Sequence, residues 1–167
     1  IEGRMMWLLR SSPLDIRTLF WAKYWVGTIP LLLVAIPLIV ITNIFMDAEP
    51  LVFWLTTGTM VAATFAITAL ALGLGALFPN YDTENVAEIP TSFGGLLFMM
   101  VAVIYLGLVV LLEGWPVYIF LQAELSGEGA MSPLPLVLSA AGAAVLTVAA
   151  IALPLRAGIR RVRSIDF

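Results

Sequence analysis

The chain has 167 residues, of which 62% are hydrophobic and only 11% are charged, and its formal net charge is −3. Because soluble domains carry about 25% charged residues, this composition excludes a water-soluble globular domain, a disordered chain and a nucleic-acid binder. The sequence has no cysteine and no histidine. It therefore offers no thiolate or imidazole for catalysis or metal binding, and we expect no cofactor and no enzymatic activity.

The N-terminal residues precede the first predicted membrane span. Residues 1–4 (IEGR) match the recognition sequence of the protease factor Xa, so we interpret them as a vector-derived remnant and Met5 as the native start. Residues 6–18 are predicted to form a short amphipathic cytoplasmic helix. The segment Ser12–Asp15 favours a helix start, because it places serine at the N-cap, proline at the first helical position and a carboxylate in the first turn.

Four uncharged runs follow, and each is long enough to cross the hydrocarbon layer, which takes about 20 apolar residues in a helix. None alternates with a period of two, and in lipid a helix satisfies its own backbone hydrogen bonds, so helices are favoured over barrel strands. Residues 5–167 are therefore predicted to form one all-α integral membrane domain. Its four transmembrane helices are expected at about residues 20–46, 51–78, 91–112 and 133–156.

The connections between the spans are assigned by their charges and turn residues. Asp47–Pro50 is a tight outside turn, and Pro79–Ser92 is a cytoplasmic loop in which Thr91 or Ser92 caps the third span. Residues 113–132 form a longer outside segment. Its uncharged part has only 10 residues, 114–123, and includes a proline, so we expect a short re-entrant or interfacial segment.

The distribution of charge fixes the expected orientation. No Asp, Glu, Lys or Arg interrupts the uncharged part of any predicted span (residues 24–46, 51–78, 91–112 and 133–155), which argues against a proton-coupled carrier and a voltage sensor. Glu88 and Glu113 fall at span ends, where we expect them to be hydrated. The basic residues cluster at the two ends of the chain, so both termini are predicted to be cytoplasmic, which requires an even number of spans. The native basic residues are Arg10, Arg17, Lys23, Arg156, Arg160, Arg161 and Arg163.

Small residues spaced four apart predict where helices pack closely, as in Ala69/Gly73, Ala71/Gly75 and Ser139/Ala143. Such faces are common in membrane bundles and do not indicate a particular function. The sequence contains no GxxxxGK[ST] phosphate-binding loop, so these residues cannot themselves form an ATP-hydrolysing subunit of that class.

Two segments carry a resemblance to a known family. Residues 6–23 (MWLLRSSPLDIRTLFWAK) resemble the part of ABC-2-type transporter permeases in which a short cytoplasmic helix precedes a basic residue opening a span. Residues 73–89 (GLGALFPNYDTENVAEI), followed by Ser92–Gly95 (SFGG), are similar to a stretch of an ABC exporter family within that group. Together the two segments cover about a quarter of the chain, and the second is the more specific.

The resemblance implies a role and a partner. The chain would be the C-terminal four-span part of a six-span permease unit, or a short natural relative of one, in a bacterial or archaeal cell membrane. Its cytoplasmic helix would couple to a separate ABC ATPase subunit, and it would form a homo- or hetero-oligomer with other permease spans. The coupling residues would be Leu8, Arg10, Ser12, Pro13, Leu14, Asp15 and Arg17. A second contact would come from the inner-loop residues Asp82, Glu84, Asn85 and Glu88.

Two other hypotheses about the function remain open at this point. A small structural or assembly membrane protein would use its small-residue faces to bind another membrane subunit and would need no ATPase. An intramembrane enzyme is disfavoured because no span holds an acid, base or nucleophile pair. The lipid bilayer is a partner under every hypothesis. For the basic residues, anchoring to lipid head groups is as good an interpretation as contact with an ATPase.

Overall fold

A computed structural model describes residues 16–78, 92–126 and 134–163, and the regular secondary structure of this part of the chain is all α-helix. All four of its helices are long and apolar enough to cross a membrane, which confirms the four predicted spans and fits a multi-pass membrane protein. The helices are α2 (Ile16–Phe45), α3 (Pro50–Leu77), α4 (Phe93–Ser126) and α5 (Leu134–Arg163).

The first span begins earlier than the sequence predicted. Helix α2 runs without a break from Ile16 to Phe45, so residues 16–18 belong to the membrane helix and not to a separate cytoplasmic one. The rest of the predicted cytoplasmic helix lies outside the described residues. Helices α3 and α5 begin within one residue of their predicted starts, and α5 continues for seven residues beyond the predicted end, from 156 to 163.

Helix α4 differs most from the prediction, because it does not end at residue 112. It continues through Pro116 to Ser126, so its 34 residues extend over roughly 51 Å. No separate re-entrant segment is seen at residues 114–126. A proline inside a helix frees only one carbonyl, here that of Leu112, and an apolar medium gives the neighbouring backbone no alternative to helical hydrogen bonds. The expectation that this segment forms a distinct short element was wrong.

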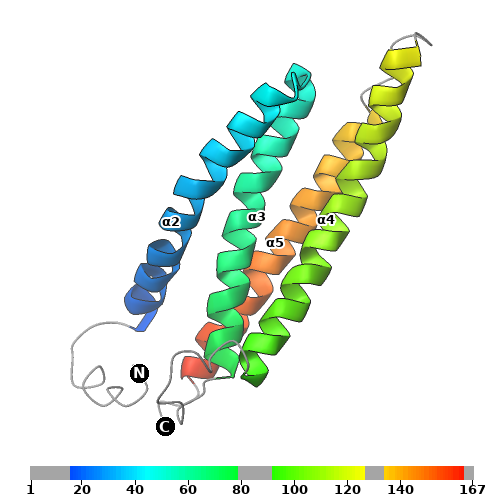
Figure 1. Cartoon of the computed structure of the whole chain (residues 1–167). Coiled ribbons are helices and arrows are strands. Elements are labelled where there is room, and N and C mark those ends of the chain that lie inside the picture. The colour runs from blue at the N-terminus through cyan, green and yellow to red at the C-terminus, as the bar shows by residue number, and fades with distance from the viewer. Residues whose placement is uncertain (1–15, 79–91, 127–133, 164–167) are drawn as a thin grey trace.

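The helices run alternately up and down, with α3 in a central position (Figure 1). Helix α3 packs against all three other helices, most extensively against α5, whereas α2 packs mainly on α3, and α4 packs on both α3 and α5. The start of α2 and the end of α5 lie at the same end of the bundle, as an even number of spans requires. We call this the basic end, because Lys23 lies near the start of α2 and Arg156, Arg160 and Arg161 lie near the end of α5.

The predicted tight turn joins α2 to α3 at the other end of the bundle. The Ala48 N–H donates to the Asn43 carbonyl at 3.0 Å, and the Asp47 N–H donates to the Ile44 carbonyl at 3.2 Å. These two bonds, with Asp47 at a φ of 46°, make the Schellman motif that commonly ends a helix. Pro50 then opens α3, where its missing N–H costs nothing.

Close packing of α3 on α5 depends on a glycine at the crossing point. A Cβ atom added to Gly73 would lie 2.5 Å from the carbonyl carbon of Pro154 and 2.6 Å from its oxygen, far inside van der Waals contact. At Gly158 a Cβ would lie 3.3 Å from the Gly73 Cα and 3.2 Å from the ring of Phe20. Glycines at these two positions let the backbones approach, which is how membrane helices gain packing energy.

Only some of the predicted small-residue faces lie at helix contacts. Ala69 and Gly73 are buried, as are Ser139 and Ala143, which confirms those two faces. Ala71 and Gly75 are exposed, and a Cβ added to Gly75 would meet nothing within 4 Å. The same spacing therefore marks two faces that pack inside the bundle and one face that no other described helix covers.

Candidate functional site

Polar side chains join the helices inside the bundle. Between α2 and α3, the Asn43 side-chain nitrogen Nδ2 donates to Thr56 Oγ1 at 2.9 Å, and Thr56 Oγ1 lies 3.3 Å from the Asn43 side-chain oxygen Oδ1. Further along the same pair of helices, the Tyr24 hydroxyl donates to the Phe65 backbone carbonyl at 3.2 Å. Such bonds hold membrane helices together where the hydrophobic effect does not act between them.

A second polar contact joins α4 to α5. The Tyr105 hydroxyl lies 2.9 Å from Thr147 Oγ1, and Thr147 in turn donates to the carbonyl of Ala143 within its own helix at 2.7 Å. Tyr105 is 4% exposed and belongs to the apolar cluster that also includes Ala66 and Val109. The Tyr105 hydroxyl is therefore satisfied although its ring is deeply buried.

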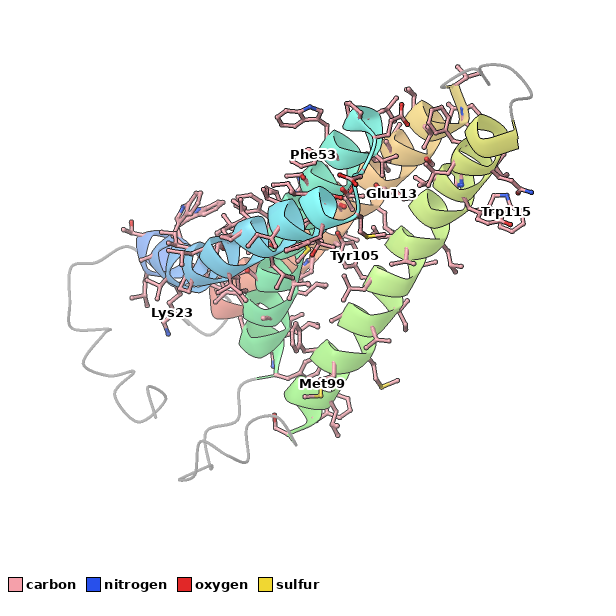
Figure 2. The ribbon with its side chains drawn as sticks, turned by 45° about the horizontal axis from the view of Figure 1, so that its top comes forward. Lys23, Phe53, Met99, Tyr105, Glu113 and Trp115 are labelled. Atoms are coloured by element: carbon pink, nitrogen blue, oxygen red, sulfur yellow. The ribbon has the colours of Figure 1, made fainter. Side chains whose placement is uncertain are left out.

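The contact between α3 and α4 contains a carboxylate. Thr59 Oγ1 lies 2.7 Å from both Glu113 Oε1 and Glu113 Oε2, and the glutamate is half-buried. Figure 2 shows Glu113 and Tyr105 projecting from α4 toward the other helices, while Trp115 points away from them. Thr59 lies nine residues past the start of α3, which is roughly 14 Å along the helix axis.

This placement overturns the expectation that Glu113 marks a hydrated span end and that the spans hold no ionisable residue. Glu113 is followed by 13 further helical residues and lies within the apolar stretch Phe93–Ala123. The sequence carried a signal that could have revealed it. The uncharged runs on either side, residues 89–112 and 114–123, are separated by this single charge and together have the length of one long helix.

The cations of the described helices lie far from Glu113. Helices α4 and α5 are antiparallel, so the Tyr105–Thr147 bond places Glu113 level with Ser139. Arg156 is then roughly 25 Å further along α5. Helix α3 has no ionisable side chain at all. Lys23 lies near the start of α2, toward the opposite end of the bundle in Figure 2.

An apolar groove lies between α3, α4 and α5, nearer the basic end. Its volume is about 450 Å³, and it is open on one side. Leu70, Ile104 and Leu153 are among the side chains that line it, and Tyr105 is its one residue with a polar side-chain group. The groove and the Glu113–Thr59 pair are separate features, since neither Glu113 nor Thr59 lines the groove.

Most of the residues assigned to a site from the sequence lie outside the described residues. These are Leu8, Arg10, Ser12, Pro13, Leu14 and Asp15 of the predicted coupling helix, and Asp82, Glu84, Asn85 and Glu88 of the inner loop. Arg17 lies in the first turn of α2, and only the backbone of this residue is described. Ser92 is confirmed as the cap of α4, because its hydroxyl accepts a hydrogen bond from the Gly95 N–H at 3.2 Å.

The described helices hold no group of three acidic, histidine or cysteine side chains placed to bind a metal ion. What they offer is an apolar bundle with one interior carboxylate. Comparison with curated proteins and with solved structures gives no match. A family model described as "Putative ATP-binding cassette" matches residues 1–167, the whole of the sequence. The chain therefore belongs to this ATP-binding-cassette family.

Proposed function

We propose that the chain is the membrane-embedded permease component of an ABC-2-type exporter, and that a separate ATPase subunit drives it. One observation carries the proposal: this member of an ATP-binding-cassette family has four apolar helices in its described residues, and its sequence has no phosphate-binding loop. The only lysine, Lys23, follows an alanine, so the Gly-Lys pair of that loop does not occur. The family description speaks of ATP binding, and in our proposal the ATP is bound by a partner.

The arrangement of the helices supports a route for coupling. Residues 6–17 resemble a coupling helix, and the last two of them are the first residues of α2, which packs mainly on α3. Helix α3 also contacts α4 and α5. A displacement imposed by an ATPase at the start of α2 would therefore reach the other half of the bundle through α3.

The outer faces of the bundle support contact with lipid and with further permease spans. Large apolar side chains remain exposed along α2 and α4, for example Leu33 and Leu111, which are each 72% exposed. In a bilayer such faces contact either acyl chains or other membrane helices. Four spans form a thin wall for a translocation path, so the proposal includes a second copy or a partner chain beside these faces.

A pull-down from native membrane extract tests the proposal. The full chain is compared with a variant lacking residues 6–17, and captured proteins are identified by mass spectrometry. We expect an ATP-binding-cassette ATPase with the full chain and none with the deletion. A second comparison uses Pro13→Ala with Asp15→Asn, which should reduce ATPase capture and abolish ATP-dependent export while leaving the helical content unchanged.

The chain itself provides a matched control for that double variant. Asp47→Asn with Pro50→Ala changes the same two residue types in the turn between α2 and α3, at the opposite end of the bundle from the proposed coupling site. This control should retain the ATPase. Capture that does not depend on residues 6–17, or capture of a membrane protein without any ATPase, would refute the coupling role and favour the structural or assembly protein.

A further inference from the structure

Glu113 is an ionisable side chain inside an apolar helix, and such residues are rare in membrane spans because burying a charge there is costly. A carboxylate has about four lone-pair sites and no donor of its own. Its hydrogen-bond partner is Thr59, whose hydroxyl has a single hydrogen to share between two oxygens that are both 2.7 Å away. The ionised side chain therefore keeps most of its acceptor capacity unused in this contact.

The described helices place no positive charge near Glu113. Helices α3 and α5 pack against α4, and α3 carries no ionisable side chain. On α5 the ionisable residues are arginines that begin at Arg156, roughly 25 Å along the axis from the level of Glu113. On α4 itself the nearest titratable residues are Tyr105 and Tyr118, and neither carries a positive charge.

The geometry narrows the kind of cation that fits. Thr59 Oγ1 lies equally close to both carboxylate oxygens and so occupies the edge that a planar guanidinium needs for a two-pronged contact. Calcium takes six to eight oxygen ligands, and the described helices hold no cluster of acidic residues that could supply them. An ammonium group is a compact charge with three donors, and the half-buried carboxylate leaves room for it to approach.

We propose that Glu113 and Thr59 form a binding site, inside the spans, for an ammonium group carried by an apolar ligand. Thr59 orients the carboxylate, and the carboxylate accepts hydrogen bonds from the ammonium and balances its charge. The ligand has an apolar body because the pair lies within the apolar lengths of α3 and α4. That this ligand is the transported cargo rests on the function proposed above. That the chain binds it does not depend on that function.

The test uses the full chain in nanodiscs of a zwitterionic lipid, without any ATPase, and octylammonium as the probe. Saturable binding is measured by calorimetry, with octanol and octanoate as the uncharged and anionic counterparts. We expect the wild type to bind octylammonium. Glu113→Gln should bind it roughly 10- to 100-fold more weakly, because the variant loses a charge-assisted hydrogen bond. Glu49→Gln, which removes another carboxylate near the start of α3, should bind like the wild type.

Equal affinity of the wild type and Glu113→Gln for octylammonium would overturn the proposal. So would a wild-type chain that binds octanol as tightly as octylammonium, or one that binds neither of them. Should Glu113→Gln fail to fold, a photoreactive alkylammonium on the wild type decides the question. Labelling of the peptides that contain Thr59 or Glu113, suppressed by excess octylammonium, supports the site, and labelling elsewhere overturns it. Because no ATPase is present, failure of this test and failure of the pull-down are distinguishable.

Discussion

The packing of α3 on α5 predicts that alanine at position 73 will weaken the bundle. The added Cβ would lie 2.5 Å from the carbonyl carbon of Pro154, whereas carbon atoms pack best about 3.5–4.0 Å apart. The clashing atoms belong to the backbone of α5, so no side-chain rotation relieves the contact. The two helices must therefore separate by about 1 Å along their most extensive interface.

The expected cost follows from two opposing terms. Overpacking a well-filled interface costs about 1–3 kcal/mol, and because the clash at Gly73 is with backbone we take the upper end. Alanine is a better helix former than glycine by about 1 kcal/mol, which offsets part of that cost. Gly73→Ala should therefore lower the free energy of unfolding by about 2 kcal/mol.

Gly75 provides the matched control, because it lies in the same helix but has open space around its Cα. Gly75→Ala should be neutral or should stabilise the protein by up to about 1 kcal/mol. Both variants are compared with the wild type by reversible unfolding in mixed micelles, followed by far-UV circular dichroism. Equal stability of Gly73→Ala and Gly75→Ala would refute the close backbone approach at Pro154.

Three further predictions concern the polar contacts and the turn, and each is measured in the same unfolding assay. Tyr105→Phe removes the hydroxyl contact with Thr147 but keeps the ring, so we expect a loss of about 0.5–1 kcal/mol; a larger loss would show that the hydroxyl does more than join α4 to α5. Asn43→Ala removes the side-chain contact with Thr56 between α2 and α3, and should cost a similar amount, about 1 kcal/mol. Asp47→Gly relieves a left-handed conformation of a residue that has a Cβ, and should stabilise the protein by up to about 1 kcal/mol, whereas Asp47→Val should destabilise it.

The sequence predicted the four spans because hydropathy is a local property. Each helix contains an uncharged run long enough to cross the hydrocarbon layer, and such a run must satisfy its backbone internally wherever it packs. The turn at Asp47–Pro50 and the cap at Ser92 were also predictable, since both depend on residue types next to a helix end. The same local reasoning misjudged residues 114–123, because it counted uncharged runs and so ended the third span before Glu113.

Contacts between helices could not be read from the chain, because they depend on which faces meet. Gly73 and Gly75 belong to equally spaced small-residue pairs, yet they are two residues apart and so point to different sides of α3. Only the tertiary structure shows that Gly73 faces Pro154 and Gly75 faces outward. Likewise the sequence predicted Glu113 to lie at a span end, whereas in the structure α4 continues past it and Thr59 lies beside it. Hydropathy set which segments are helices in the membrane, and the packing of α3 against its neighbours decided which side chains lie inside the bundle.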